Sequence, residues 1–307
     1  MLQKTPPSLN TKIKGISHVV VDVESLDVAE KFYDALGFAS VGHDQWPVAG
    51  AAPSATLEAG AGQYVVLAKG PARNDPRISA AHTAYALPKG ARDNLVETLT
   101  TKGVAVHRFR EDRPSEAGDN VYIDDPSGNR IQLVARDGAP ALSIDHAGLE
   151  TNNILWSREF YQTWLGLPVE HRVGWKTDDY LAAKSLGEKG MEAAMPGSRY
   201  WNERYSQFET EKKALRPCPQ LYFTVGGTSL AVYLASRQYQ APRDDVLSGT
   251  PCLGLSTTDE GLKQMAGFLR EQERAIEGPV THAKGPIAAS LSVKDPGANF
   301  LEFCVLR

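Results

Sequence analysis

Alternating apolar and polar positions lead into helical repeats at several places along the chain. The first is the run GISHVVVDV around His18, which has the period of a half-buried strand. Apolar residues then recur at helical spacing from Ala29 to Leu36, and Gly37 ends the helical pattern. Shorter alternating runs such as GQYVVLAKG follow and indicate closing strands. The pattern predicts a strand–helix–strands unit over about residues 12–70.

This unit recurs along the chain. The segment from His82 to Gln132 matches the segment 170 residues later without a gap, so that DPSGN at 125–129 corresponds to DPGAN at 295–299. The run around His146 matches the run around His18, 128 residues earlier, and each leads into a helix that contains the pair Phe-Tyr. The four units span about residues 12–70, 78–137, 141–236 and 248–307.

A unit of this kind leaves one face of its small sheet unpaired, so the units must pack in pairs to bury it. We therefore predict an α+β fold in which four βαβββ modules in tandem form two half-open barrel domains. A short linker from Asp137 to Ala141 contains Gly138 and Pro140, so the expected domains are residues 1–137 and 141–307. Packing of the first unit against the fourth is the alternative pairing.

The third unit is longer than the others. The histidine of the first unit precedes that of the second by 64 residues, whereas 106 residues separate His146 from Cys252, which leaves about 42 extra residues (106 − 64) at about 171–219. This insertion contains the aromatic and charged run RYWNERYSQFETEKK. A lid over a site, an oligomer contact and a solvated excursion are all consistent with it.

Composition narrows the classes of partner. The net charge is −4, with 33 basic and 37 acidic residues mixed along the chain, which disfavours nucleic acid and anionic membranes as partners and favours small molecules. Three cysteines are an odd number and favour a reducing compartment. The polar segment from Met1 to Lys14 lacks the apolar core of a signal peptide, and no apolar run is long enough to span a bilayer. We expect a cytoplasmic protein.

The repeated residues carry a family likeness. They are a histidine in the first strand of a unit (His18, His82, His146), the Phe-Tyr pair in the helix, the DPxGN turn, and Glu302 in a last strand. The pattern resembles the vicinal oxygen chelate superfamily, which includes the glyoxalase, bleomycin-resistance and extradiol dioxygenase families, and the four-module length is most similar to the type I extradiol dioxygenases. The resemblance implies one divalent metal, Fe(II) or Mn(II) with Zn(II) as the alternative, held by two histidines and a carboxylate.

The same resemblance implies the ligand positions. If neighbouring modules pair, the sets are His18, His82 and Gln132 in one domain and His146, Cys252 and Glu302 in the other. If the first module pairs with the fourth, they become His18, Cys252 and Glu302, and His82, Gln132 and His146. The matching positions in the other two modules are expected at Val65 and Val232, which cannot ligate. His282 is near the place of an acid/base histidine, and Ser292 stands where a tyrosine is expected.

These residues give three candidate functions. The first is an extradiol-type dioxygenase that acts on a catechol-like or other vicinal-oxygen molecule, with His282 as its catalytic acid/base. The second is a glyoxalase- or isomerase-like metalloenzyme in which a carboxylate moves a proton. The third is a metal-free protein of the bleomycin-resistance type that binds a small planar molecule. Because anionic oxygen offsets the hydration a cation loses, we expect the set that contains Glu302 to hold metal more firmly than the set that contains Gln132. A homo-oligomer is compatible with each function.

Overall fold

The computed structural model describes residues 12–46, 52–71, 81–109, 119–151, 154–173, 220–234, 247, 249–250 and 252–307. Most of the insertion expected at 171–219 lies outside these residues, because only 171–173 are described. No helix in these ranges is long and apolar enough to cross a membrane.

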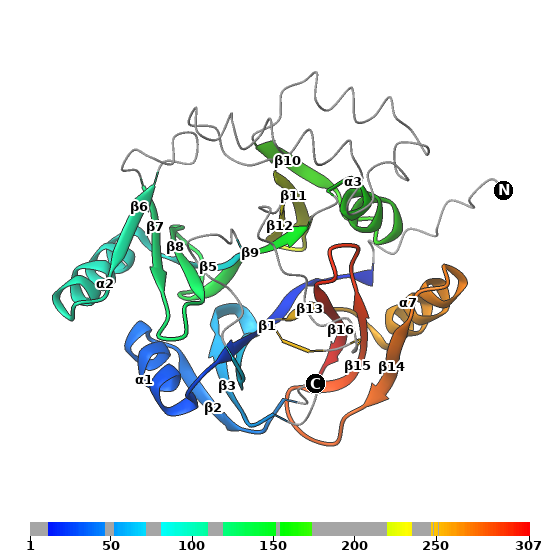
Figure 1. The fold of residues 1–307 in the computed structure, drawn as a ribbon, viewed down its shortest axis with the longest axis horizontal. Helices are drawn as coiled ribbons and strands as arrows, with labels where there is room; N and C mark the ends of the chain where they lie inside the picture. Colours follow the sequence, from blue (N-terminus) through cyan, green and yellow to red (C-terminus); the bar gives the residue numbers. More distant parts are fainter. Residues whose placement is uncertain are drawn as a thin grey trace.

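Each module contains a first strand, a helix and three further strands, in the predicted order (Figure 1). Module 1 comprises β1 (Gly15–Val23), α1 (Leu26–Leu36), β2 (Ala39–His43), β3 (Ser54–Ala59), the short helix η3 (Gly60–Gly62) and β4 (Gln63–Lys69). Module 2 comprises β5 (His82–Leu87), α2 (Lys89–Thr101), β6 (Val106–Phe109), β7 (Asn120–Asp124) and β8 (Arg130–Ala135). Module 3 comprises β9 (Ser143–Thr151), α3 (Ile154–Arg158), η4 (Glu159–Trp164), β10 (Val169–Val173), β11 (Gln220–Val225) and β12 (Thr228–Leu234). Module 4 comprises β13 (Cys252–Ser256), α7 (Asp259–Glu271), β14 (Ile276–Thr281), β15 (Ile287–Lys294) and β16 (Phe300–Leu306).

Two eight-stranded sheets result, and neither closes into a complete barrel. One joins modules 1 and 4 in the order β14-β15-β16-β13-β1-β4-β3-β2, and we call it the 1/4 sheet. The other joins modules 2 and 3 in the order β10-β11-β12-β9-β5-β8-β7-β6, and we call it the 2/3 sheet. The fold class is the predicted one. The pairing of neighbouring modules within 1–137 and within 141–307 is not observed, and the first module pairs with the fourth.

One apolar core joins the helix-covered faces of both sheets. Alternate strand residues such as Val19, Leu253 and Leu133 pack in the same buried cluster as Tyr33 of α1 and Met265 of α7. The opposite face of each sheet, which we call its inner face, carries the intervening residues. The helices of modules 1 and 2 lie on one side of the molecule and those of modules 3 and 4 on the other (Figure 1).

The two Asp-Pro turns, DPSGN at 125–129 and DPGAN at 295–299, tie together modules that belong to different sheets. In the turn between β7 and β8, the carboxylate of Asp125 accepts hydrogen bonds from Asn129 Nδ2 (2.9 Å) and from Tyr33 Oη of α1 (3.4 Å). Asn129 Nδ2 also donates to the carbonyl of Asp22 at the end of β1 (2.8 Å). Modules 3 and 4 repeat the arrangement with Tyr161, Asp295, Asn299 and Glu150. These turns are structural, as predicted, and they explain why the aromatic-hydroxyl residue of the helix recurs.

This topology has a consequence for fragments. A fragment of residues 1–137 holds half of the strands of each sheet, so its central strands β1 and β5 would lack their partners β13 and β9. We expect this fragment to be unfolded or aggregated by itself and to form a folded complex when it is produced with residues 141–307. Circular dichroism and size-exclusion chromatography test this. A monomeric fragment 1–137 that unfolds cooperatively would contradict the role given to the long-range pairing.

Candidate functional site

The inner face of each sheet carries two of the four repeated first-strand positions. At the centre of the 1/4 sheet, His18 lies opposite Gly254 and Cys252 lies opposite Val20. At the centre of the 2/3 sheet, the same relation holds for His82 with Gly148 and for His146 with Ala84. A Cβ atom at Gly254 would overlap the His18 ring, and one at Gly148 would lie 2.5 Å from Cε2 of Tyr233. The glycines therefore leave room for the rings on the inner faces.

A β-bulge lies directly before the histidine in β1 and in β9. In β1, Ile16 pairs with Leu255 and His18 with Gly254, so Ser17 is the extra residue. In β9, Asp145 is the extra residue between the paired positions 144 and 146. Each bulge residue bonds to Nδ1 of the next histidine: Ser17 Oγ at 2.9 Å from His18 and Asp145 Oδ2 at 2.8 Å from His146. The two bulges thus orient two rings, one with a hydroxyl and one with a carboxylate.

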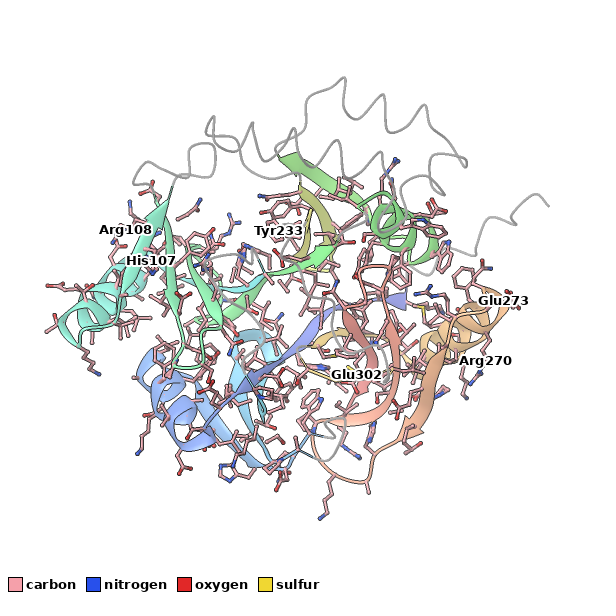
Figure 2. All side chains as sticks on the ribbon, in the orientation of Figure 1. His107, Arg108, Tyr233, Arg270, Glu273 and Glu302 are labelled. Atoms are coloured by element: carbon pink, nitrogen blue, oxygen red, sulfur yellow. The ribbon has the colours of Figure 1, made fainter. Side chains whose placement is uncertain are left out.

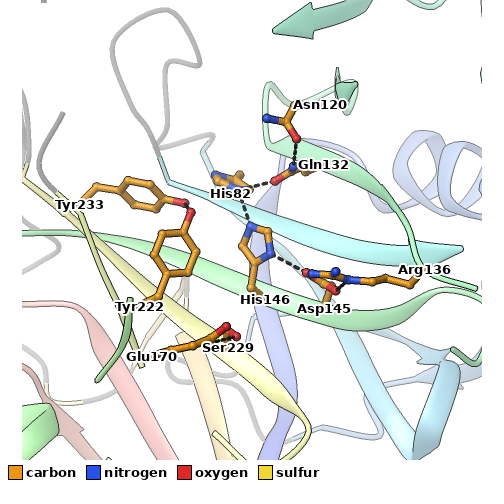
Figure 3. Close-up of polar contacts among 10 residues, drawn as sticks. All are labelled: His82, Asn120, Gln132, Arg136, Asp145, His146, Glu170, Tyr222, Ser229 and Tyr233. Carbon is orange, nitrogen blue, oxygen red and sulfur yellow. Dashed lines mark hydrogen bonds and ion pairs between the residues drawn. The ribbon is translucent and has the colours of Figure 1, made fainter. Parts of the chain in front are cut away.

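In the 2/3 sheet, three donor atoms converge (Figure 3). His82 Nε2 lies 3.1 Å from His146 Nε2 and 3.1 Å from Gln132 Oε1. Gln132 comes from β8, next to β5, and its Nε2 donates to Asn120 Oδ1 at 3.3 Å. The structure therefore brings together all three members of one of the implied ligand sets.

Asp145 fixes which nitrogen of His146 faces this group. Burial alone would raise the pKa of Asp145, but hydrogen bonds from His146 and Arg136 and their positive charges lower it to about 2. Arg136 Nε lies 2.8 Å from the other carboxylate oxygen. An ionised carboxylate only accepts hydrogen bonds, so Nδ1 of His146 carries a proton, and in the neutral ring the lone pair is then on Nε2, which faces His82. This is the tautomer that a metal-binding imidazole needs.

The spacing of the donors fits a shared cation. Two histidine nitrogens, each about 2.1 Å from one ion, are about 3.0–3.4 Å apart when the angle between them is about 90–110°. The observed separation of the Nε2 atoms of His82 and His146 is 3.1 Å. Among the described residues, no three His, Cys, Asp or Glu side chains are grouped to hold a metal ion, and the oxygen that lies 3.1 Å from His82 Nε2 belongs to the Gln132 amide.

Aromatic side chains surround the histidine pair. The rings of Tyr122 and Tyr233 lie with centroids 5.6 Å from that of His82, and the ring of Tyr222 lies 6.0 Å from that of His146. The hydroxyls of Tyr222 and Tyr233 are 3.4 Å apart. Figure 3 shows this tyrosine pair beside the histidines. Since Tyr122, Tyr222 and His82 are only partly buried, the inner face of this sheet is reached by solvent.

The equivalent place in the 1/4 sheet is closed. His18 Nε2 lies 2.9 Å from Glu302 Oε2, and both side chains are buried. Trp46 covers them: its ring centroid is 4.2 Å from that of His18, and its Nε1 donates to Glu302 Oε2 at 3.3 Å. Trp46 packs in a second apolar cluster with inner-face residues that include Val20, Val66, Cys252 and Phe300. Figure 2 shows Glu302 in this sheet and Tyr233 in the other.

The set His18, Cys252 and Glu302 does not form a three-donor metal group in the described residues. Glu302 directs its Oε2 at His18 and Trp46 instead. Burial, followed by the charge of Glu302 and the neighbouring Cys304, raises the pKa of the Cys252 thiol well above its ordinary value, so the thiol stays protonated. The expectation that Glu302 closes the firmer metal set stays a prediction, to be set against these contacts.

His282 belongs to the closed site. Its Nε2 is 2.8 Å from Ser290 Oγ, and Ser290 bonds to Glu302. Partial burial lowers the pKa of His282, with the charge of Glu302 opposing that shift. Ser292, where a tyrosine was expected, pairs with Glu302 across β15 and β16. The implied acid/base histidine is therefore connected to the 1/4 sheet and not to the donor group of the 2/3 sheet.

Two positions assigned from the sequence are wrong by one residue. Val65 and Val232 face the helix side and belong to the main core. The inner-face positions that match Glu302 are Val66, which pairs with Val20, and Ala231, which pairs with Gly148. Neither can ligate, so the conclusion drawn from those positions is unchanged.

The remaining histidines lie apart from both sites. His43 contacts Glu30 at the surface, and His107 lies on β6 near Asp124 (Figure 2). The side chain of His171 is outside the described residues. Sequence reasoning missed Asp145, Trp46 and the tyrosines. For Asp145 a signal exists, because the apolar alternation of SIDHAGLET shifts its phase at that residue.

The comparisons with known proteins agree with this architecture. Residues 15–133 match the family model of the Glyoxalase/Bleomycin resistance protein/Dioxygenase superfamily. No protein of curated function matches the sequence. A dioxygenase candidate from Bacillus subtilis has a similar structure, with 15% identity, 96% of this chain and 86% of that chain covered, and a TM-score of 0.62. Glyoxalase I from Zea mays is also similar, with 17% identity, 97% and 94% coverage and a TM-score of 0.59. At these identities the likeness to the solved structures shows the fold, and the family model identifies residues 15–133 as similar to the glyoxalase/bleomycin resistance/dioxygenase superfamily.

Proposed function

We propose that the chain is a metal-dependent enzyme of the extradiol dioxygenase type whose active site is the inner face of the 2/3 sheet. One observation carries the proposal: His82 Nε2 lies 3.1 Å from His146 Nε2 and 3.1 Å from Gln132 Oε1. These three side chains would hold a divalent ion, with Fe(II) or Mn(II) as the proposed metals because imidazole and amide oxygen suit them. The Glu302 set is not part of this site.

The charge of the donor set favours an anionic substrate. His82, His146 and Gln132 are neutral as ligands, so the cation would keep its full charge toward the substrate. When bound, the metal would supply an electrophilic centre with open positions for two vicinal oxygens and for dioxygen. A catechol-like molecule provides two such oxygens on a planar ring. We therefore propose a small aromatic vicinal-oxygen compound as the substrate.

The surrounding side chains have separate proposed roles. Asp145 would hold His146 in the tautomer that presents Nε2. Tyr122, Tyr222 and Tyr233 offer ring faces to a planar substrate, and aromatic pairs of this kind prefer offset or edge contacts. The adjacent hydroxyls of Tyr222 and Tyr233 would donate hydrogen bonds to the substrate oxygens. Because His282 is connected to the 1/4 sheet, the hydroxyls of Tyr222 and Tyr233 are the proposed acid/base groups beside the donor set of the 2/3 sheet.

Metal analysis tests the proposal. Protein purified in the presence of iron, manganese or zinc in turn should bind about one ion per chain. His146→Ala should abolish this binding, because it removes one of the three proposed donors and leaves Asp145 without the imidazole that it orients. His18→Ala is the matched control, since it removes the equivalent histidine of the closed sheet and should leave the ion in place. Folding of both variants is checked by circular dichroism.

Oxygen uptake with a panel of catechols then tests the reaction. Uptake that depends on iron or manganese and disappears in His146→Ala supports a dioxygenase. Metal binding without oxygen uptake would favour a glyoxalase- or isomerase-like reaction. If no metal binds the wild-type protein under any of these conditions, the enzyme proposal fails, and the metal-free binding protein becomes the better description.

A further inference from the structure

We propose that Gln63, a residue outside both histidine groups, positions His146 for metal binding by anchoring the bulge that carries Asp145. The proposal rests on the metal site proposed for the 2/3 sheet. Gln63 is the first residue of β4 and belongs to module 1, whereas the bulge that it reaches belongs to module 3. It would therefore act through Asp145 and His146 and is a positioning residue.

The side-chain amide of Gln63 bridges the two sheets. Its Oε1 accepts from the backbone N–H of Ile144 at 2.7 Å, and its Nε2 donates to the carbonyl of Ile16 at 3.0 Å. Because an N–H must meet an oxygen and a carbonyl must meet an N–H, these two partners fix the orientation of the amide. Gln63 is only 6% exposed. Both of its hydrogen bonds are therefore buried, where an unpaired polar group is costly.

The two residues that bond to Gln63 occupy equivalent positions, each directly before a β-bulge. Ile16 directly precedes the bulge residue Ser17, and Ile144 directly precedes the bulge residue Asp145. A bulge leaves its strand without the regular ladder at that point, so the direction of the bulged side chain depends on what holds the flanking backbone. At residue 144 the backbone N–H is held by Gln63. The next residue, Asp145, makes the hydrogen bond of 2.8 Å between its Oδ2 and Nδ1 of His146.

The neighbouring backbone leaves little freedom for this contact to shift. The turn η3 that precedes Gln63 packs against the start of β9, and a Cβ atom at Gly60 would overlap the backbone at Ala141. The backbone of η3 therefore lies directly against the backbone at the start of β9, in addition to the hydrogen bond that the Gln63 side chain makes there.

The equivalent residue of module 3 provides a contrast. His18 pairs with Tyr64 and His146 pairs with Ser229, so Gln63 corresponds to Thr228. Thr228 Oγ1 donates within its own turn, to the carbonyl of Val225 at 2.7 Å. The bridge between the bulges is therefore made by Gln63 and not by its repeat partner, and Thr228→Val is a matched control at the same register position.

The test compares Gln63→Met, Gln63→Glu and Thr228→Val with the wild type. Gln63→Met removes both hydrogen bonds at nearly constant volume. In metal-free protein, nitrogen NMR of the His146 ring should show loss of the single Nδ1–H tautomer in Gln63→Met and its retention in Thr228→Val. The affinity for Mn(II) or Zn(II) should fall roughly tenfold in Gln63→Met, at the low end of the loss expected for outer-shell partners. Gln63→Glu keeps the acceptor for Ile144 and should retain most of the affinity.

The readouts separate the two proposals. If the wild type binds no metal but Gln63→Met still changes the His146 tautomer, the metal site fails and the positioning role stands. If the wild type binds metal and Gln63→Met matches it within about twofold in affinity, with an unchanged tautomer, the positioning role is overturned. If Gln63→Met does not fold, Gln63→Glu becomes the deciding variant, because it keeps the oxygen that accepts from Ile144. A roughly tenfold loss of metal affinity in Gln63→Glu would then contradict the proposal.

Discussion

Replacing Glu302 by alanine should lower the free energy of unfolding by about 3–5 kcal/mol, the range for removal of one member of a buried charged pair. Glu302 is the acceptor for Trp46 Nε1 and lies 2.9 Å from His18 Nε2. The variant would leave both groups buried without this partner and would open space beneath Trp46. Metal binding at the 2/3 sheet should be unchanged, because its three donors lie on β5, β8 and β9, whereas Glu302 lies on β16 of the other sheet.

The pH dependence of stability should change with the same substitution. Burial alone would raise the pKa of Glu302, but the hydrogen bond and charge of His18, together with Ser290 and Trp46, lower it. A carboxyl group whose pKa is lowered by folding adds stability above its unfolded pKa of about 4.3, and that stability is lost as the pH falls through the folded pKa. Glu302→Ala should therefore lose stability mainly at neutral pH and show a shallower decline in acid.

Urea denaturation of metal-free wild type and variant, from about pH 3 to about pH 8, measures both effects, because carboxyl groups titrate near pH ~4, at the acid end of this range. Glu302→Gln is the control for shape, because it keeps an oxygen for Trp46, and its loss should be smaller. A Glu302→Ala protein as stable as the wild type, or one that loses its metal, would show that Glu302 has a different role from the one that its contacts indicate.

The two inner faces start from equivalent residues and reach opposite outcomes. Each holds a histidine that follows a bulge, but Ser17 is neutral whereas Asp145 is ionised and accepts from Nδ1. At the last-strand position, the Glu302 carboxylate pairs directly with His18, whereas Gln132 presents a neutral amide oxygen to His82. Trp46 then covers the first site. The presence of the expected carboxylate therefore does not identify the site with converging donors.

The repeat made the modules and the histidine positions predictable, because both depend on short-range periodicity. His18, His82 and His146 do lie at equivalent places on the inner faces. Module pairing was not predictable, because the first strand of every module has the same kind of edge. No local pattern in the sequence indicates which two first strands pair. The contacts that fix the pairing, such as Asn129 with Asp22, join residues 107 positions apart.

The contrast between the contacts of the two sites was not predictable from the sequence for a related reason. A strict period of two places Ser17 and Asp145 on the helix side, whereas the bulges turn them toward their histidines. The assignments at Val65 and Val232 have a similar error of one residue. Trp46 reaches Glu302 across 256 residues of sequence, and no local pattern reports such a contact.

Replacing Gln132 by glutamate should raise the affinity of the 2/3 site for a divalent ion by about tenfold or more, which corresponds to about 1.4 kcal/mol. Gln132 Oε1 already lies 3.1 Å from His82 Nε2, so the substitution places an anionic oxygen where a neutral one now stands. Two histidines and a carboxylate form a set that binds Fe(II) with open positions. The hydrogen bond to Asn120 is retained if the Asn120 amide rotates to donate.

The same change should weaken binding of an anionic vicinal-oxygen molecule to the metal-loaded protein, because the carboxylate offsets charge that the cation would otherwise present to the substrate. Competition with a chelating indicator gives the Mn(II) affinity, and titration with a catechol gives the second effect. Gln264→Glu on the exposed surface of α7 adds the same charge far from the site and should change neither value. Equal Mn(II) affinity in the wild type and Gln132→Glu would mean that Gln132 does not face the ion, and the proposed donor set would have to be abandoned.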